Sequence, residues 1–280
     1  MDENLLIRMM KGEKFHKMSG AGNDFIVIDN RDQHIPEALK PEFARRVCTR
    51  GMSVGADGIL LLEDSDKATF RMRHFNADST EGEMCGNGAR CIARFAHLTG
   101  VAPNKMTIET LSGMVDAKVE GEQVTIRLNP VTLTSLHQKI TVDGSPILVH
   151  YLEEGTPGLP HAVVYKDDLT FEGDITEEGR SIRYHPFFPR GTNVNFCRVI
   201  QKDEILNRTY ERGVEDETLA CGTGSAAVAA VSNRLGLCGT EVNIKMKGGT
   251  LKVTLSDPDM KNIYLTGDAR VVYEASLTGE

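Results

Sequence analysis

The sequence predicts a mixed α/β (α+β) protein made of two pseudo-symmetric domains, and three observations carry this prediction. The tetrad Cys-Gly-X-Gly begins at Cys85 and again at Cys221, a separation of 136 residues (221 − 85). The same offset holds without a gap far outside the tetrads, so that Gly113 corresponds to Gly249. Each copy also combines short apolar strands with one largely buried helix. We therefore expect two mixed, mostly antiparallel sheets, each wrapped around a central helix, with the active site in the cleft between them.

The bulk properties exclude several classes of protein. A chain of 280 residues with 40% hydrophobic and 26% charged residues has enough material for two cores. Its net charge of −8 argues against nucleic acid as a partner. No apolar run approaches the ~20 residues of a membrane span, and the acidic start lacks the plan of a secretory signal. We expect a cytoplasmic protein with six reduced cysteines and no membrane partner.

The elements of the first copy follow from hydrophobic periodicity and turn residues. Residues 36–50 have helical spacing, and residues 86–99 predict a largely buried helix that ends at Gly100. Apolar runs and alternation predict strands at 25–28, 59–63 and 70–76, and a meander over 105–111, 114–120 and 123–129.

The second copy repeats this plan, with strands at 161–165, 193–200 and 205–211. Residues 222–235 are apolar on all sides, which predicts a buried helix. The tail at 266–273 is expected to be a strand that crosses back to complete the sheet of the first domain. With a boundary at Asn129-Pro130, the expected domains are 13–129 plus about 268–280, which carries Cys85, and 130–267, which carries Cys221.

Both tetrad cysteines stand directly before a predicted helix. The free amides of a helix N-terminus favour negative charge, so this setting is expected to lower a cysteine pKa below its usual ~8.5. The glycines also let the backbone approach an anion such as a carboxylate. The alternative is that both cysteines are small buried hydrophobic residues. Their matched positions favour a catalytic role, whereas Cys48, Cys91, Cys197 and Cys238 are expected to be structural.

Seven segments together resemble the diaminopimelate epimerase family of cofactor-independent amino-acid epimerases. They are Met18-Ser-Gly-Ala-Gly-Asn-Asp-Phe25, Gly55-Ala-Asp-Gly58, Phe75-Asn-Ala-Asp78, Cys85-Gly-Asn-Gly-Ala-Arg-Cys91, Thr192-Asn-Val-Asn195, Tyr210-Glu-Arg-Gly213 and Ala220-Cys-Gly-Thr-Gly224. The resemblance covers nearly the whole chain, and the set is far more specific than any one segment.

The resemblance implies a role for each matched residue. Cys85 and Cys221 would be the two acid/base thiols, supported by His161 and Glu211. Substrate would be contacted by Asn23, Asn76, Asn193, Glu211 and Arg212, and its reacting carboxylate would be held by Gly86, Asn87, Gly222 and Thr223. No pyridoxal phosphate, other cofactor or metal is implied. The expected partners are a small amino-acid substrate and a second copy of the chain in a homodimer.

The implied reaction converts LL-2,6-diaminopimelate to the meso form, in lysine and peptidoglycan precursor biosynthesis. Leu159 stands where the family pattern has an asparagine before the Pro-His pair, and Gly58 stands where some relatives have glutamine. Leu159 keeps open an epimerase or racemase for another amino acid. Two remoter alternatives are a cysteine hydrolase that uses Cys221 with His161 as base, and a non-catalytic amino-acid binding protein.

Overall fold

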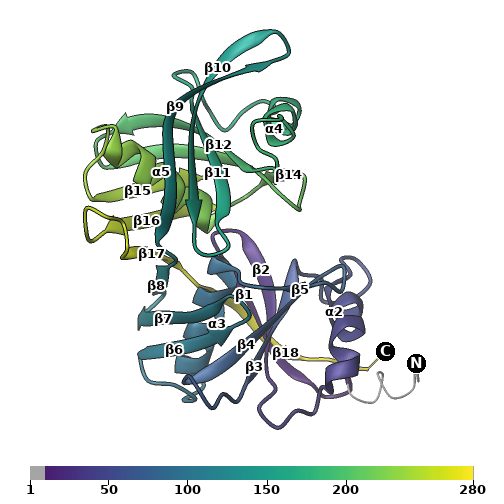
Figure 1. Cartoon of the computed structure of the whole chain (residues 1–280). Coiled ribbons are helices and arrows are strands. Elements are labelled where there is room, and N and C mark those ends of the chain that lie inside the picture. Colours follow the sequence, from purple (N-terminus) through teal and green to yellow (C-terminus); the bar gives the residue numbers. More distant parts are fainter. Residues whose placement is uncertain (1–9, 280) are drawn as a thin grey trace. The chain divides into compact units, whose positions relative to one another are not determined.

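A computed structural model of the chain describes residues 10–279 (Figure 1). The acidic segment at residues 1–4, used above to argue for a cytoplasmic location, lies outside the described residues. The chain divides into two compact units, which are described separately below. The first runs to Ile126 and resumes at Gly267, and the second is Arg127–Thr266. Within residues 10–279, no helix is long and apolar enough to span a membrane.

The first unit is built on one mixed sheet. Its strand order is β18-β1-β2-β3-β4-β6-β7-β8, with the short β5 beside β4. The pairs β2–β3 and β4–β6 are parallel, and the other pairs are antiparallel. The strands are β1 (Lys14–Gly20), β2 (Asn23–Asp29), β3 (Gly58–Glu63), β4 (Phe70–Asn76), β5 (Glu81–Gly82), β6 (Lys105–Thr110), β7 (Gly113–Glu120), β8 (Gln123–Leu128) and β18 (Arg270–Ser276).

The second unit has the same topology. Its order is β9-β10-β11-β12-β13-β15-β16-β17, with the short β14 beside β13. The parallel pairs are β11–β12 and β13–β15, which correspond to β2–β3 and β4–β6. The strands are β9 (Val131–Val142), β10 (Ser145–Glu154), β11 (Leu159–Tyr165), β12 (Asn193–Gln201), β13 (Glu204–Glu211), β14 (Asp216–Thr218), β15 (Glu241–Met246), β16 (Gly249–Leu255) and β17 (Ile263–Asp268).

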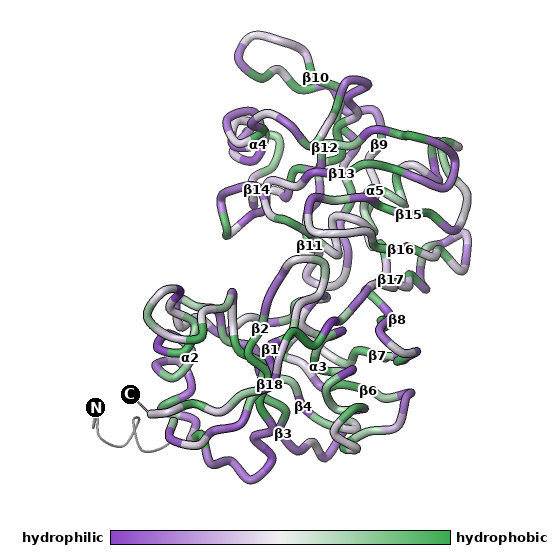
Figure 2. The backbone as a smooth tube through the Cα atoms, turned by 180° about the vertical axis from the view of Figure 1, so that it is seen from behind, coloured by the Kyte–Doolittle hydropathy of each residue, from purple (hydrophilic) through white to green (hydrophobic). Residues whose placement is uncertain are grey.

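Each sheet is covered by helices on both faces. The central helices, α3 (Gly86–Leu98) and α5 (Gly222–Arg234), each contact six strands of their own unit. On the opposite face lie α2 (Lys40–Cys48), preceded by the 3-10 helix η1 (Glu37–Leu39), and α4 (Thr176–Arg183). Along α2 the hydropathy alternates between polar and apolar residues, as expected for a helix with one buried face (Figure 2). The apolar residues of α5 are buried all round, because the sheet encloses that helix.

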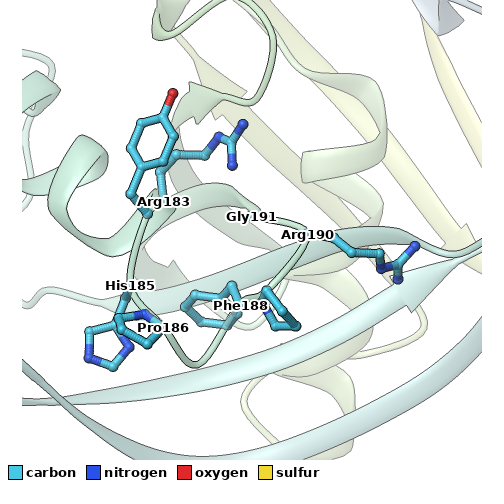
Figure 3. Close-up of a pocket in the computed structure, with 8 residues that line it drawn as sticks. Arg183, His185, Pro186, Phe188, Arg190 and Gly191 are labelled. Carbon is cyan, nitrogen blue, oxygen red and sulfur yellow. The ribbon is translucent and has the colours of Figure 1, made fainter.

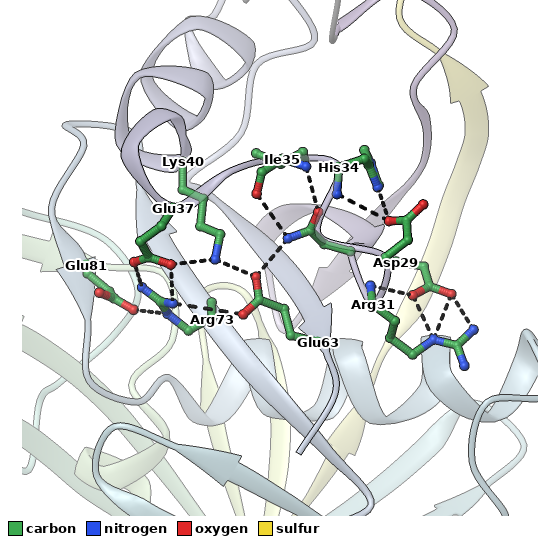
Figure 4. Close-up of polar contacts among 11 residues, drawn as sticks. Asp29, Arg31, His34, Ile35, Glu37, Lys40, Glu63, Arg73 and Glu81 are labelled. Atoms are coloured by element: carbon green, nitrogen blue, oxygen red, sulfur yellow. Dashed lines mark hydrogen bonds and ion pairs between the residues drawn. The ribbon is translucent and has the colours of Figure 1, made fainter. Parts of the chain in front are cut away.

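A network of charged side chains fixes η1 and α2 to the first sheet (Figure 4). Lys40 Nζ lies 2.7 Å from Glu37 Oε2 and 2.6 Å from Glu63 Oε1. Arg73 forms ion pairs with Glu37 and with Glu81, which lies on β5 just before the first cysteine loop. The side chains of Lys40 and Arg73 are almost fully buried, so each depends on its carboxylate partners to balance the cost of desolvation.

Most predicted elements are confirmed, including both central helices and the meander over β6–β8. The tail is not one strand over 266–273: β17 ends at Asp268, and β18 begins at Arg270 and pairs antiparallel with β1, so it does complete the first sheet. The helix predicted at 36–50 is shorter, and its N-terminal turn is the 3-10 helix η1. Strand β1, the β9–β10 hairpin and α4 were not predicted from the sequence.

Candidate active site

Cys85 is the N-cap of the central helix of the first unit. Its backbone is extended, with φ −129° and ψ 118°, and its sulfur accepts a hydrogen bond from the Gly88 N–H at 3.5 Å. A cysteine in this position points its Sγ at the unpaired amides of the first helical turn, the most electropositive end of the helix. Gly88 lets the first turn of α3 lie close to β3, because a Cβ at this position would lie 3.1 Å from the Leu60 side chain.

Two asparagine amides lie beside the Cys85 thiol. Cys85 Sγ donates to Asn23 Oδ1 at 3.5 Å, and Asn87 Nδ2 donates to the same oxygen at 3.4 Å. Asn23 begins β2, and its Nδ2 donates to Asp57 Oδ2 at 2.6 Å. The structure therefore brings two predicted site residues, Asn23 and Asn87, together beside the first thiol.

Asn76, at the end of β4, is another predicted substrate contact in the first unit. It lies opposite Gly58 in the β3–β4 ladder, and its Nδ2 donates to Thr80 Oγ1 at 2.9 Å. The next residue, Ala77, donates its N–H to the Asp57 carbonyl at 3.0 Å. Asn76 is thus held close to the turn that carries Asp57.

Cys221 occupies the matching N-cap position on α5. Its φ and ψ are −120° and 112°, and its sulfur accepts from the Gly224 N–H at 3.4 Å. The Thr223 hydroxyl lies 3.6 Å from the sulfur. The Glu211 carboxyl is a further neighbour of this thiol, and Thr218 Oγ1 donates to it at 2.9 Å.

Burial raises the pKa of both ionisable groups of this site. Burial first, and then the Glu211 carboxylate, raise the pKa of the Cys221 thiol well above its usual value. Burial also raises the pKa of Glu211, against the effect of hydrogen bonds from Thr218 and Cys221. The lowered cysteine pKa expected from the helix N-terminus is therefore wrong for Cys221, because desolvation outweighs the helix amides. A proton shared in this pair belongs to the thiol and the carboxyl together.

His161 belongs to a row of buried, hydrogen-bonded polar side chains next to the first turn of α5. Its Nδ1 is 3.3 Å from Asn195 Nδ2, and Thr209 Oγ1 donates to Asn195 Oδ1 at 2.9 Å. Burial lowers the pKa of His161 to about 3, so the imidazole is neutral near pH 7. Gly224 makes room for this row, since a Cβ there would lie 2.3 Å from Asn195 Oδ1.

Arg212 and Asn193 form the remaining part of the predicted site. Asn193 Oδ1 accepts from the backbone N–H of Arg212 at 2.8 Å, which fixes the start of β12 against the end of β13. The Arg212 guanidinium donates to the Arg190 carbonyl at 3.3 Å. Burial, and then the charges of Arg183 and Arg190, lower the pKa of Arg212. Among residues 10–279, no carboxylate forms an ion pair with Arg212, so its surroundings favour an incoming anion.

A pocket of about 420 Å³ lies along the loop after α4 (Figure 3). It is lined by Arg183, Tyr184, His185, Pro186, Phe188, Pro189, Arg190 and Gly191. Arg183 is already paired with Glu215, and Arg190 with Glu153. Neither tetrad cysteine lines this pocket, so it is not the site assembled by the predicted residues.

Several residues in and around the site could have been predicted only in part from the sequence. Asp57 belongs to the quoted Gly-Ala-Asp-Gly segment and Arg90 to the Cys85 segment, so a signal for both was present. Asn195 likewise ends the quoted Thr-Asn-Val-Asn segment. Glu154, whose charge would raise the pKa of the Cys221 thiol, had no such signal: it is 2% exposed, and neither carboxyl oxygen has a hydrogen-bond partner within residues 10–279. Burial raises the pKa of Glu154 well above its usual value.

Comparisons with known proteins agree over nearly the whole chain. The profile of the diaminopimelate epimerase family matches residues 15–134 and 156–272. The diaminopimelate epimerase of Archaeoglobus fulgidus is 42% identical over 276 residues, covering 94% of this chain and 95% of that protein. That of Aquifex aeolicus is 40% identical over 279 residues, covering 95% and 98%.

Two solved structures share the fold at much lower identity. A phenazine biosynthesis protein of the PhzF family from Bacillus anthracis matches with a TM-score of 0.71 at 16% identity, covering 95% of this chain and 99% of that one. A probable proline racemase from Agrobacterium radiobacter matches with a TM-score of 0.70 at 15% identity, covering 94% and 92%. Two pseudo-repeated α/β halves are thus a fold that several protein families share.

Proposed function

The chain belongs to the diaminopimelate epimerase family, and we propose that it interconverts LL- and meso-2,6-diaminopimelate by a two-base mechanism at Cys85 and Cys221. The observation that carries this proposal is the matched pair of cysteine N-caps, each with its sulfur on the first turn of a central helix. One cysteine, as thiolate, removes the α-proton, and the other, as thiol, delivers a proton to the opposite face of the carbon. The roles exchange in the reverse reaction.

The second unit offers a route to the thiolate. The Glu211 carboxyl hydrogen-bonds the Cys221 thiol and can take its proton. The Thr223 hydroxyl and the Gly224 N–H then stabilise the negative sulfur. The neutral His161 supports this site through Asn195 rather than as a charged group.

The helix N-termini suit the carboxylate at the reacting carbon. Removal of the α-proton moves negative charge onto this carboxylate, and oriented amides stabilise such charge without rearranging. The first amides of α3 belong to Gly86 and Asn87, and those of α5 to Gly222 and Thr223. We assign these four residues to the carboxylate for that reason.

The far end of the substrate carries a second carboxylate, for which Arg212 is the proposed partner. A guanidinium can bind a carboxylate through two parallel hydrogen bonds, and Arg212 is surrounded by other arginines. Asn193 holds the Arg212 backbone, and Asn76 supplies a neutral amide from the first unit. Leu159 adds no polar contact, so recognition of the far end rests on Arg212 and the asparagines.

Replacing either catalytic cysteine tests the mechanism. Cys85→Ser and Cys221→Ser should each lower kcat for diaminopimelate epimerisation by at least about 1,000-fold, because a serine hydroxyl is too weak an acid to ionise as a thiol does. Cys238→Ser is the matched control, since Cys238 is also buried but donates only to the Ala229 carbonyl. It should keep the parent rate. Full turnover by either catalytic variant would end the two-thiol scheme.

A panel of amino acids decides the substrate. The parent enzyme should invert the α-carbon of diaminopimelate far faster than that of proline, glutamate or aspartate, as followed by chiral chromatography. Faster turnover of another amino acid would identify the chain as an epimerase with a different substrate, in keeping with Leu159. A stable acyl-enzyme at Cys221 would indicate a hydrolase, and binding without proton exchange would indicate a binding protein.

Two further properties belong to this proposal. The reaction uses soluble metabolites and reduced thiols, which suits the cytoplasm. We also propose a homodimer, for which sedimentation of the purified enzyme is the test.

A further inference from the structure

We propose that Asp57 and Arg90 are positioning residues for Cys85, because they fix the orientations of two side-chain amides, Asn23, which accepts from the thiol, and Asn87, which donates to the same Asn23 oxygen. The four residues Asp57, Asn23, Asn87 and Arg90 are called the amide relay below. The proposal rests on the function proposed above, in which Cys85 is a catalytic thiol, and it assigns this chain a device that only one of its two thiols possesses.

One end of the relay is the Asp57 carboxylate. Asn23 Nδ2 donates to Asp57 Oδ2 at 2.6 Å, which is short for an N–H···O bond. Asp57 is itself fixed, since Arg50 donates to its Oδ1 at 2.9 Å and the Asp24 N–H donates to its Oδ2 at 3.1 Å. The carboxylate therefore has little freedom to follow a reorienting amide.

A carboxylate decides which way an asparagine faces. A side-chain amide offers an oxygen acceptor at one end of its fork and an NH₂ donor at the other. A flipped Asn23 would place its oxygen against Asp57 Oδ2, and two acceptors at hydrogen-bond distance repel each other. Asn23 Oδ1 therefore faces Cys85, where it accepts from the thiol at 3.5 Å.

The other end of the relay is the Arg90 guanidinium on α3. Arg90 is fully buried, and its Nη2 donates to Asn87 Oδ1 at 3.0 Å. It also donates to the Gly86 carbonyl at 3.3 Å and the Asp268 carbonyl at 3.4 Å. Since the guanidinium holds the Asn87 oxygen, the Asn87 NH₂ faces outward and donates to Asn23 Oδ1 at 3.4 Å.

The relay thus runs from a carboxylate through two amides to a guanidinium, and each amide can take only one orientation. The Asn23 oxygen receives both the Asn87 NH₂ and the Cys85 thiol. An acceptor beside a thiol favours its protonated form. The relay accordingly holds the proton on Cys85 when this cysteine waits to act as the acid.

The second unit lacks the relay completely. The offset of 136 residues (221 − 85) takes Asn23, Asp57, Asn87 and Arg90 to Leu159, Asn193, Thr223 and Ala226. At each of these four positions the second unit has a different residue type, so the hydrogen bonds of the relay have no counterpart there. Cys221 has the Glu211 carboxyl instead. The two thiols are therefore prepared for proton transfer by different chemical groups.

Alkylation of Cys85 by iodoacetamide tests the relay without any substrate. Thiolates react and thiols do not, so the rate at Cys85, resolved by peptide mass spectrometry, reports its proton. In Asp57→Asn the Asn23 amide can turn its NH₂ to the sulfur, and alkylation should accelerate about 2- to 10-fold, the factor that one hydrogen bond supplies. Asn23→Leu, which installs the residue of the second unit, should accelerate it similarly.

Asp24→Asn is the matched control. Like Asp57→Asn, it removes a carboxylate that accepts a hydrogen bond from Arg50, here from Nη2 to Asp24 Oδ1 at 2.5 Å. It leaves the hydrogen-bond partners of the Asn23 side chain in place. Its alkylation rate should stay near that of the parent. In an Asn23→Leu background, Asp57→Asn should add no more than Asp24→Asn does, because the amide that links Asp57 to the thiol is gone.

The relay is overturned if Asp57→Asn and Asp24→Asn change the Cys85 rate equally, or if Asp57→Asn still acts in the Asn23→Leu background. These results are independent of the proposed function. A parent enzyme that fails to epimerise diaminopimelate would refute the function and leave the alkylation result to judge the relay. With an active parent, Asp57→Asn should also enlarge the primary isotope effect of α-deuterated substrate on kcat/KM, which a mere loss of folded enzyme does not change.

Discussion

At the scale of single residues, the two thiols share one backbone setting and differ in their side-chain neighbours. Both sulfurs cap a helix, yet Cys85 faces an amide oxygen and Cys221 faces a carboxyl and a hydroxyl. Glycines make these arrangements sterically accessible. Gly224 shows this most clearly, because Asn195 and Thr209 occupy the space that a side chain would need.

Gly224→Ala should therefore destabilise the protein although alanine is the better helix former. The added Cβ would lie 2.3 Å from Asn195 Oδ1 and 3.1 Å from Thr209 Oγ1. Overpacking of this kind costs about 1–3 kcal/mol, against a gain of about 1 kcal/mol in helix propensity. Urea unfolding measures the change, and activity should fall as the row of side chains around His161 shifts. Gly239→Ala, where nothing lies within 4 Å, should be neutral; equal effects at both sites would contradict this account.

The burial of His161 leads us to expect a specific pH dependence of the free energy of unfolding. Its pKa is about 3 in the folded protein, against a usual value of 6.5. Between these values the unfolded chain binds more protons, so stability is highest above pH 6.5 and is lost as the pH falls. The slope from one such group is at most about 1.4 kcal/mol per pH unit. His161→Gln should flatten the decline between pH 6 and 4 in urea titrations, and an unchanged slope would show that the residue is not buried as described.

At the scale of elements, the network of Lys40, Glu37, Glu63 and Arg73 holds the outer helix of the first unit on its sheet. Lys40 lies at the first turn of α2, where a cation gains nothing from the helix dipole. Lys40 instead stabilises the folded protein by pairing with the Glu63 carboxylate, which is nearly buried on β3. The network is structural and lies apart from the cysteine caps.

Lys40→Met should cost roughly 3 kcal/mol of unfolding free energy, because it leaves the Glu63 carboxylate buried without its nearest cation. Lys118→Met is the matched control. Lys118 is 44% exposed and pairs with Glu120 on the surface, so its loss should cost less than about 1 kcal/mol. Denaturant midpoints at pH 7 give both values, and a similar cost for the two variants would rule out a structural role for the buried network.

The elements also show what a sequence of this kind can reveal. The repeat and the apolar α5 were enough to predict two sheets wrapped around central helices. A helix that is apolar on all sides must be buried, and the repeated strand and helix patterns assign the same architecture to both units. The β9–β10 hairpin was not predicted, because many of its residues are exposed and its sequence lacks a regular alternation of polar and apolar residues. The amide relay could not be found from sequence, because Asp57 and Asn23 meet only through the parallel pairing of β2 with β3.

At the scale of the whole molecule, the proposed mechanism assigns the proton transfers to features that both units share and substrate recognition to features in which they differ. Both units keep the strand order, the central helix and the sulfur cap. They differ at positions that the proposed mechanism assigns to the far end of the substrate: Asn76 ends β4, and its counterpart Arg212 directly follows the corresponding strand β13. In that mechanism, one α-carbon is approached from both faces by two equivalent thiols, and the rest of the substrate is bound by unequal neighbours.

The most direct test of the two-base mechanism is epimerisation of LL-diaminopimelate in D₂O, stopped at a few per cent conversion and analysed by mass spectrometry. Two thiols with separate protons predict that the new meso product carries deuterium at the inverted α-carbon, while the remaining LL substrate still carries protium. Product that retains the original protium would mean that one group removes and returns the proton, and would contradict the shared role of Cys85 and Cys221.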